Sequence, residues 1–583
     1  MLHIVEERMR KQLDIQLSSK TISVRELDGM EIAHAGRYLI AKKLLEEGVA
    51  SVDPMSADNP LIFSAGPFAG TNFSNANRLS VGCKSPLTGG IKEANSGGTF
   101  AFAMGQLEIV GITFYGALEE WGVIYIPKDG PIRFEDASDY LGLGNFECAE
   151  LLHRKYGDKT SLAICGPVGE YLGLLAGIAF SDTENRPSRF AARGGVGAVM
   201  GMKKIKAVVI EKHKMPTFQD RKKIMVAVKD YGKKLDESVA VQALKTTGTA
   251  MVADLTNHLG ALPVNNFSAG QLTSGSDADP LKMGGDYIRE LNLSRRGDTS
   301  HACMPGCLIK CSNVYNDEDG NEIVSPLEYE TIGLLGTNCG LSDPDELAYL
   351  NATANDLGVD SIELGATIGV LMEAGEAEFG DLDFMRQCLE DIKAGNERGK
   401  FLAQGTARVG DELGVARVPV IKKQAISAYD PRVIEVTGIS MMLTAQGADH
   451  TTGNAPSFKC DDKSIRQLVA ESLKMQIGSA IADSFGICVF GRTVTDVNLQ
   501  LIAEAINNGF GTSIDAAFIK NIGLETLKLE AEFNKQAGFG TEDDELPEFF
   551  IKEALPPTGK FARLQSAEIN QIMRELINEG AGL

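Results

Sequence analysis

The sequence lacks any run of about 18 or more apolar residues, the length that an α-helix needs to cross a bilayer. Its richest apolar stretch, 161–180, is interrupted by Pro167 and Glu170, so no membrane span is expected. The opening residues, MLHIVEERMRKQLDI, lack an apolar segment followed by small residues. This argues against a secretory signal and predicts a cytoplasmic protein.

Basic residues are in the minority. The chain has 57 Lys and Arg against 79 Asp and Glu, which gives a net charge of −22. Nucleic-acid binding requires a basic footprint, so no nucleic-acid partner is expected. Most of the negative charge is interpreted as a solvated surface that favours solubility.

The chain of 583 residues is too long for a single hydrophobic core, and it contains no solenoid period and no low-complexity segment. Alternation at 13–17 and 21–24, around the turn 18–20, predicts a β-hairpin. Further apolar segments predict strands at 61–63, 123–126, 161–164 and 207–210, with glycine-rich loops between them. The first part of the chain is therefore expected to be rich in β-structure.

After about residue 217 the apolar residues recur with helical spacing. Helices are predicted at 221–235, 345–357, 362–377, 384–395, 464–482, 499–508 and 524–536. The pattern predicts an α+β protein with a β-rich N-terminal domain at 1–212 and two mainly helical domains at 213–420 and 421–583.

A short echo links two of the predicted helix ends. NDLGVD at 355–360 and DSFGIC at 483–488 each have a polar residue, a glycine three positions later, an apolar residue, and then Asp or Cys. Chance is one explanation for six residues. The functional alternative is that two helix ends hold two copies of one ligand about a pseudo-twofold axis.

Three of the ten cysteines form a cluster, Cys303-x3-Cys307-x3-Cys311, in which Pro305 and Gly306 permit a tight turn. An iron–sulfur cluster is usually bound by four thiolates. Zinc also accepts four thiolates, but commonly from two separated pairs, and no CxxC pair is present. Cluster ligation is favoured over zinc and over a structural accident. The best candidates for a fourth ligand are Cys339 and Cys488.

The loop ARGGVGAVMG at 192–201 is interpreted as a generic phosphate-binding loop, with Arg189 and Arg193 as possible sources of charge. No strand precedes it, which excludes a dinucleotide-binding fold.

Two further residues are candidates for acid–base chemistry. Histidine is rare, with seven in the chain, and His450 lies in a Gly/Thr-rich loop, where it is either a surface residue or an acid–base group. Glu330 precedes the apolar segment IGLL and is either a base or an acid at a helix N-terminus.

Taken together, these motifs resemble the aldehyde:ferredoxin oxidoreductase family, the tungsten or molybdenum bis-pterin enzymes. The resemblance runs from end to end. Its most specific part is GGVGAVMGMKKIKAVVI at 194–210. The other matching segments are NPLIFSAGP at 59–67, KSPLTG at 84–89, ANSGG at 94–98, GPVGE at 166–170, Tyr329-Glu330, YDPR at 429–432, DSFGIC at 483–488, and Leu546-Pro547 with Phe550.

The resemblance implies a β-rich domain that forms the base for two pterin dithiolenes, capped by two helical domains. The four ligands of the 4Fe–4S cluster would be Cys303, Cys307, Cys311 and Cys488. A Mg²⁺ ion would join the pterin phosphates through the backbone carbonyls of Asn95 and Phe190, and Arg78 would bridge cluster and pterin. The remaining pterin contacts fall at Gly97, Arg189, Ala192, Asn355, Val359, Asp360, Thr452, Asp483 and Ile487.

The resemblance also implies a reaction, the oxidation of an aldehyde to a carboxylic acid or its reverse. Glu330 would accept a proton, and His450 would polarise or protonate the carbonyl oxygen. Electrons would leave one at a time through the cluster to ferredoxin or to an iron–sulfur partner subunit. The alternatives are a family member without aldehyde activity, acting as an electron-relay or assembly subunit, and a zinc-binding structural protein.

The chain departs from the family pattern in three places. The first pterin motif opens with Asn355 in place of Asp, which is expected to weaken pterin contact without abolishing it. The cysteine spacing is three and three rather than two and three. The positions of a metal-binding Glu-x-x-His at the family's dimer interface are Tyr349 and Ala352 here, so we expect a different assembly, a hetero-oligomer with a separate electron-transfer subunit.

Overall fold

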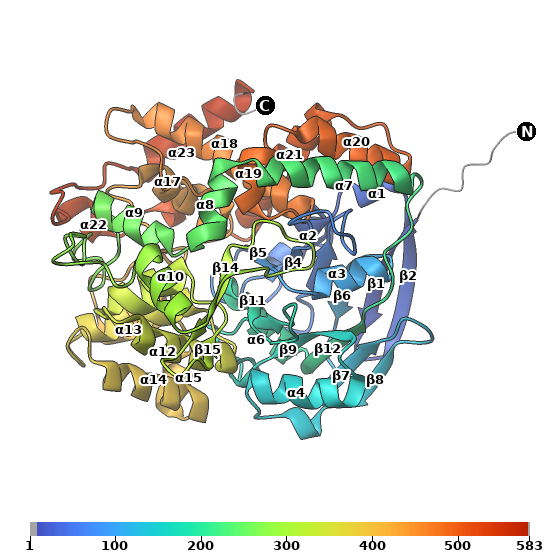
Figure 1. Ribbon diagram of the computed structural model, residues 1–583, viewed down its shortest axis with the longest axis horizontal. Helices are drawn as coiled ribbons and strands as arrows, with labels where there is room; N and C mark the ends of the chain where they lie inside the picture. The colour runs from blue at the N-terminus through green and yellow to red at the C-terminus, as the bar shows by residue number, and fades with distance from the viewer. Residues whose placement is uncertain (1–8, 581–583) are drawn as a thin grey trace, which may run out of the picture.

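The computed structural model describes residues 9–580, so most of the segment examined for a secretory signal lies outside the described residues. A β-rich part, blue to cyan in Figure 1, is followed by a helical part that runs from green to red. The predicted α+β fold class is confirmed. The division into three domains, with boundaries after residues 212 and 420, stays a prediction.

The first sheet contains six strands in the order β2-β1-β6-β3-β4-β5. Its predicted hairpin is confirmed, because β1 pairs antiparallel with β2 and places Leu13 opposite Val24. Strands β1 and β6 are parallel to each other, and β3 is antiparallel to β6. The strands are β1 (Arg10–Gln16), β2 (Thr21–Leu27), β3 (Leu61–Ala65), β4 (Leu79–Lys84), β5 (Ile91–Ser96) and β6 (Ile109–Tyr115).

The second sheet repeats this topology, with the order β11-β10-β9-β12-β7-β8. Strands β7 and β12 are parallel, as β1 and β6 are, and β9 is antiparallel to β12. The strands are β7 (Gly122–Ile126), β8 (Arg133–Asp136), β9 (Thr160–Cys165), β10 (Ile178–Phe180), β11 (Arg189–Ala191) and β12 (Ile205–Glu211). The four strands predicted after the hairpin correspond to β3, β7, β9 and β12 and are confirmed.

The two sheets share one apolar core. At its centre, Phe63 of the first sheet meets Phe180 of the second at 5.9 Å between ring centroids, and Phe100 and Phe114 pack edge-on against Phe63. Each such aromatic pair adds about 0.5–1.5 kcal/mol beyond the burial of its surface. The edge strands β5 and β11 contact each other, so the duplicated halves meet at these edges.

Helices link the strands within each half. The first half contains α1 (Gly29–Ile32), α2 (Gly36–Glu46) and α3 (Phe100–Gln106), and the second contains α4 (Asn145–Tyr156), α5 (Pro167–Glu170) and α6 (Val196–Met202). Both α2 and α4 precede the third strand of their half. Both α3 and α6 precede the last strand.

The rest of the chain is mainly helical. Its first part contains α7 (Arg221–Asp236), α8 (Val239–Thr247), α9 (Met251–Leu259), α10 (Gly285–Ser294), α11 (Tyr329–Thr331), α12 (Pro344–Leu357), α13 (Ser361–Glu373), α14 (Leu382–Ala394), α15 (Glu397–Leu402) and α16 (Thr406–Leu413). Its second part contains α17 (Glu435–Leu443), α18 (Ile465–Ser484), α19 (Arg492–Thr495), α20 (Leu499–Phe510), α21 (Ala516–Gln536), α22 (Glu548–Lys552) and α23 (Ser566–Asn578). Short strands β13 (Asp298–His301), β14 (Ser312–Asn316) and β15 (Glu322–Val324) surround the cysteine segment.

The predicted helices are present, with two differences at their ends. The helix predicted at 362–377 stops at Glu373, because Gly375 adopts a φ of 83° that ends the helix. The helix predicted from residue 524 begins at Ala516, where Asp515 caps it by accepting a hydrogen bond from Phe518 N. In the described part of the chain, a single helix with the length and apolarity of a membrane span is not found. One sharply bent pair, 465–484 with 489–495, meets both measures together.

Candidate functional site

Each sheet holds one of the two echoed helix ends through a glycine that follows its third strand. A Cβ on Gly66, after β3, would lie 2.0 Å from the carbonyl oxygen of Phe485. A Cβ on Gly166, after β9, would lie 2.6 Å from the carbonyl oxygen of Leu357. Both distances are below van der Waals contact, so any side chain here would push the helix end away.

The same symmetry governs the backbone hydrogen bonds. Arg78 N donates to the carbonyl oxygen of Gly486 at 3.1 Å, and Gly177 N donates to that of Gly358 at 2.9 Å. Gly358 and Gly486 have φ values of 74° and 65°, which only glycine adopts readily. The segments 355–360 and 483–488 therefore occupy equivalent positions in a duplicated scaffold, as the functional interpretation of the echo requires.

The two halves differ in charge where their motifs begin. Arg37, on α2, donates from Nη1 to Asp483 Oδ2 at 3.2 Å. Its counterpart at the start of α4 is Asn145, whose amide donates to the backbone carbonyl of Asn355 at 2.8 Å. The Asn at the start of the first motif thus faces a neutral partner, and the Asp of the second faces a cation.

A buried charge network surrounds Asp483. Arg37 is 1% exposed and also forms a bidentate ion pair with Glu530, at 2.7 and 2.8 Å. Burial and the nearby Glu93 carboxylate raise the pKa of Asp483, and burial raises the pKa of Glu93. The carboxylates also raise the pKa of Arg37, so the guanidinium holds this group of acids together.

The four predicted cluster cysteines come together around one cavity of about 220 Å³, which we call the cysteine cavity. Cys303, Cys311 and Cys488 line it directly, while Cys307 lies beside them. Burial raises the pKa of the Cys303 thiol to about 12, and Cys307 and Cys488 add to the shift while Arg189 and Arg78 oppose it. A bound metal cluster would reverse this shift by stabilising the thiolates.

The sulfur atoms lie further apart than a single zinc ion requires. Zinc–sulfur bonds of about 2.3 Å place tetrahedral thiolates within roughly 4 Å of one another. Among residues 9–580, no three of these thiols approach one another within 4.8 Å. Cys339, the other candidate fourth ligand, is buried elsewhere and donates to the carbonyl oxygens of Leu334 and Gly365.

The predicted cofactor residues fall into two groups. The first group lines the cysteine cavity: Arg78, Gly97, Arg189, Phe190, Ala192, Asn355 and Val359. A second group does not line it: Asn95, Asp360, Thr452, Asp483 and Ile487. Asn95 and Phe190, the predicted Mg²⁺ positions, lie on the contacting edge strands β5 and β11. An edge strand leaves some of its backbone groups without a strand partner, and the Asn95 carbonyl oxygen accepts a hydrogen bond from Arg78 Nη2 at 3.1 Å.

The prediction that no strand precedes the phosphate loop is wrong, because the short strand β11 ends at Ala191, directly before the loop. The loop itself has a different role from the predicted one. A Cβ on Gly194 would lie 2.6 Å from the Lys92 side chain, and one on Gly197 would lie 2.2 Å from the carbonyl oxygen of Gly177. These glycines allow chain segments to pack closely, and the loop is not an open anion cradle. Arg193 is likewise turned inward, donating to Asp360 Oδ2 at 3.3 Å.

Glu330 and His450, which are 120 residues apart in the sequence, meet in a second cavity of about 460 Å³, which we call the histidine cavity. His450 Nε2 lies 3.4 Å from Glu330 Oε1. Glu330 Oε2 accepts a hydrogen bond from Ala428 N at 3.0 Å, whereas Oε1 has no hydrogen-bond partner among the described residues. Arg78 and Cys488 line both cavities, so the two are adjacent.

A hydrogen-bond chain sets the tautomer of His450. Arg193 Nη1 donates to Ser427 Oγ at 3.0 Å, so the serine hydroxyl is free to donate its own proton. Ser427 Oγ lies 3.0 Å from His450 Nδ1 and 3.4 Å from the carbonyl oxygen of Ala448. We assign the proton to the shorter contact, which makes Nδ1 the acceptor and directs Nε2–H toward Glu330.

The sequence did not single out two tyrosines that complete this cavity. The Tyr329 hydroxyl donates to the carbonyl oxygen of Ala428 and lies 3.0 Å from Thr256 Oγ1, and its ring lies 5.3 Å from that of Tyr429. Burial and the nearby Glu330 carboxylate raise the pKa of Tyr429 well above its ordinary value. Both tyrosines lie in segments that match the family, Tyr329 next to Glu330 and Tyr429 next to Asp430. That position in the sequence is the one signal that could have pointed to them.

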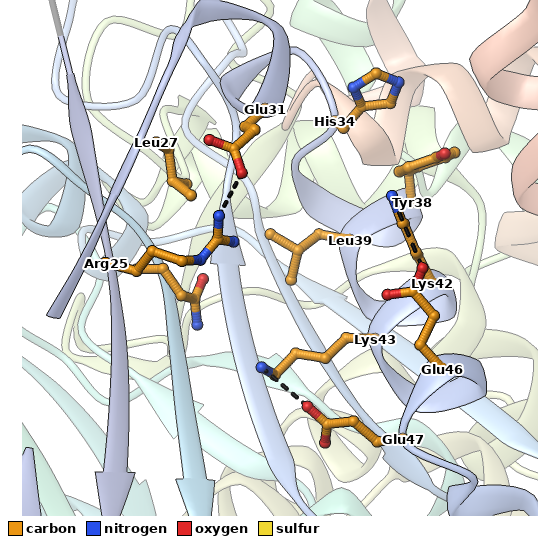
Figure 2. A pocket seen from close by; sticks show the side chains of 11 residues that line it. Arg25, Leu27, Glu31, His34, Tyr38, Leu39, Lys42, Lys43, Glu46 and Glu47 are labelled. Atoms are coloured by element: carbon orange, nitrogen blue, oxygen red, sulfur yellow. Dashed lines mark hydrogen bonds and ion pairs between the residues drawn. The ribbon is translucent and has the colours of Figure 1, made fainter. Parts of the chain in front are cut away.

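A further hollow lies between the β1–β2 hairpin and α2 and shares no lining residue with the two cavities (Figure 2). Its charged side chains pair with one another, as Lys43 does with Glu47 at 3.1 Å and Lys42 with Glu46 at 3.9 Å. These exposed pairs leave little charge for a ligand, and nothing connects this hollow to the two cavities.

Comparison with known protein families gives a match over nearly the whole chain. Residues 12–212 match the family described as aldehyde ferredoxin oxidoreductase, N-terminal domain, and residues 226–579 match its domains 2 and 3. The tungsten-containing aldehyde ferredoxin oxidoreductase of Pyrococcus furiosus is 31% identical over 575 residues, covering 93% of this chain and 91% of that protein. That of Thermococcus kodakarensis is 30% identical over 579 residues, covering 93% and 91%.

Two more distant relatives are also informative. The aliphatic sulfonate oxidoreductase, WOR-like subunit, of Pyrococcus furiosus is 25% identical over 564 residues, covering 89% of this chain and 85% of that one. Among solved structures, the active-site complex BamBC of benzoyl coenzyme A reductase superposes with a TM-score of 0.79 at 19% identity, covering 98% of this chain and 99% of that one. At this identity the likeness shows a common fold.

Proposed function

The chain belongs to the aldehyde ferredoxin oxidoreductase family, and from this we propose that it interconverts an aldehyde and a carboxylic acid at a tungsten or molybdenum bis-pterin centre. It is an oxidoreductase of the aldehyde ferredoxin oxidoreductase type. We further propose that a 4Fe–4S cluster passes the electrons on to ferredoxin or to an iron–sulfur partner subunit.

The observation that carries this proposal is the adjacency of the two cavities. The acid–base pair Glu330 and His450 lines one cavity, the cysteines line the other, and Arg78 and Cys488 belong to both. A redox enzyme of this type needs its proton-handling groups next to its route for electrons.

The residues present fit a bis-pterin cofactor. Two equivalent helix ends, 355–360 and 483–488, suit two copies of one ligand. Arg189 Nε is buried without a hydrogen-bond partner among the described residues, although Arg189 lines the cysteine cavity, so it has a donor left for a polar ligand. The backbone carbonyls of Asn95 and Phe190 would hold the Mg²⁺ ion between the two pterins.

The cysteines likewise fit a 4Fe–4S cluster. Three thiols come from one turn and the fourth, Cys488, from the end of the second motif, and the spacing of their sulfurs suits a polynuclear cluster better than one zinc ion. Gly97 supports this arrangement, because a Cβ there would lie 3.3 Å from Cys303 Sγ. When bound, the pterin metal supplies the two-electron oxidation and the cluster accepts the electrons singly.

The protein side chains handle the protons. Glu330 Oε1 is the free carboxylate oxygen and would accept a proton from the water that adds to the aldehyde, while Ala428 N–H fixes Oε2. His450 Nε2–H would donate to the carbonyl oxygen and polarise it.

The walls of the histidine cavity suggest the class of substrate. Leu244, Met251, Val252, Leu255 and Pro456 provide apolar lining opposite Glu330 and His450. We therefore propose an aldehyde with an aliphatic or aromatic tail that packs against this lining.

Anaerobic elemental analysis of purified protein, combined with an aldehyde-dependent viologen assay, tests the proposal. Tungsten or molybdenum, about four iron atoms per chain and reduction of viologen by an apolar aldehyde are expected. Iron without tungsten or molybdenum would contradict it and would favour an electron-relay or assembly subunit. Stoichiometric zinc in a colourless preparation would point to a structural protein.

A further inference from the structure

The helix α7 stands out because its charge opposes that of the chain. It carries six basic and two acidic residues, in a protein whose net charge is −22. Its buried residues Ile224, Tyr231 and Leu235 form one stripe. The opposite stripe, exposed to solvent, consists of Lys222, Val226, Lys229 and Lys233.

The inner face of α7 contacts the segments that carry the cluster cysteines. A Cβ on Gly232 would lie 3.0 Å from the side chain of Leu308, the residue after Cys307. The Tyr231 hydroxyl forms a 2.8 Å hydrogen bond with Thr495 Oγ1, and the nearby Cys488 and Cys307 contribute to raising its pKa. An α-helix is about 10–12 Å in diameter, so a partner on the outer face of α7 is about one helix away from these cysteines.

The outer surface of α7 has the composition of a transient docking site. Val226 is 69% exposed and Met225 43% exposed, with lysines on both sides. Val239, at the start of α8, is 86% exposed and continues the surface toward α19, because Ser238 Oγ lies 3.2 Å from Thr493 Oγ1. A small apolar centre with a charged rim is typical of interfaces that form and dissociate. In Figure 1, α7 runs across the upper part of the molecule, below α20 and α21 in the view and well separated from α14 and α15 at the lower left.

We propose that the outer face of α7 is the docking site for an acidic iron–sulfur electron-transfer protein or subunit. The proposal rests on the proposed function, because it needs electrons to leave through the cysteine cluster. Charge complementarity identifies the partner, because an acidic protein is repelled by the net negative charge of this chain and attracted to the basic outer face of α7. Such fields steer association and set orientation more than they add affinity.

The test uses the anaerobically purified holoenzyme and two triple variants with equal charge change. K222E/K229E/K233E reverses the outer stripe of α7. R386E/K393E/K400E is the control and reverses three exposed basic residues on α14 and α15. Each enzyme is titrated by calorimetry with a purified acidic 4Fe–4S ferredoxin, and aldehyde oxidation is followed with that ferredoxin or with benzyl viologen as the acceptor.

For the α7 variant we expect the dissociation constant for ferredoxin to be about tenfold higher, with a similar rise in the KM for ferredoxin. The viologen rate and the metal content should stay at wild-type levels. Wild-type binding should weaken between about 0.05 and 0.5 M salt, and binding by the α7 variant should not. The control variant should behave as wild type.

Equal affinities of the α7 and control variants for ferredoxin would overturn the proposal. A second result would also overturn the proposal: the wild-type enzyme binds a short DNA duplex, and K222E/K229E/K233E loses DNA binding but keeps ferredoxin binding. If wild-type enzyme reduces no viologen with any aldehyde, the proposed function fails. The calorimetric comparison would still decide whether α7 binds an acidic carrier.

Discussion

Replacing Glu330 with Gln tests the assignment of the base directly. Ala428 N donates to Oε2 at 3.0 Å, and His450 Nε2 lies 3.4 Å from Oε1. Glutamine has the same shape and can still accept from Ala428 N through its amide oxygen. The variant therefore removes the ability to accept a proton and leaves the packing intact.

The expected loss follows from the role. General base catalysis by a positioned side chain contributes about 10²–10⁴-fold. Since each tenfold change in rate corresponds to about 1.4 kcal/mol, E330Q should raise the barrier by about 3–5 kcal/mol. The loss should appear in kcat, with KM changed less than threefold or so, because the apolar cavity walls that hold the substrate tail are unchanged.

The assay is aldehyde-dependent viologen reduction under anaerobic conditions, with tungsten, molybdenum and iron measured on the same samples. H450Q is the matched variant that tests His450, the other member of the proposed acid–base pair. A fully loaded E330Q enzyme with a kcat within about threefold of wild type would refute the assignment of Glu330 as the base. Loss of metal in E330Q would instead show that the side chain supports the cofactor.

Three further predictions concern the scaffold. Cys488→Ala should remove the iron absorbance of the cluster, whereas Cys339→Ala, which alters a thiol bonded only to backbone carbonyls, should retain it. Arg37→Met should lower stability by about 3–5 kcal/mol because it leaves buried carboxylates unpaired, and adding Glu530→Gln should restore part of that loss in anaerobic thermal melts. Burial lowers the pKa of Lys203 to about 8, so the folded chain releases this proton before the unfolded chain does. Stability should therefore rise with pH between about 8 and 10 more steeply in wild type than in Lys203→Met, as urea midpoints would show; parallel curves would contradict this.

Much of the fold follows from local patterns, but some strands have none. β1 alternates, and its buried residues Leu13 and Ile15 marked it in the sequence. β5 carries Lys92, Glu93 and Asn95, and no local pattern indicated a strand there. Lys92 and Glu93 are buried, and Lys92 pairs with a residue far along the chain, Asp449, at 2.5 Å. Partners so distant in sequence leave no periodic signal.

The candidate site could likewise be predicted only in part from local sequence patterns. Spacing alone brought three cysteines together, since they lie within one turn. The choice between Cys339 and Cys488 depended on which helix ends beside that turn, which is a tertiary fact that came from the family resemblance. The meeting of Glu330 with His450 was likewise inferred by resemblance, and no local pattern predicted the Ser427 hydrogen bond that orients the imidazole.

The duplicated scaffold becomes functional where its two halves differ. At the last position of each motif, the second half has Cys488 and the first half has Asp360. Cys488 lies with the other candidate cluster cysteines, so under the proposed function the second half would provide the route for electrons. Asp360 pairs with Arg193, which donates to Ser427 beside His450 Nδ1, so the first half would lead to the groups that move protons. We propose that a symmetric base for two equal ligands separates electron exit from proton handling through this difference at equivalent positions. The neutral Asn355 agrees with this division, because the first half has no counterpart of Arg37 to balance an Asp there.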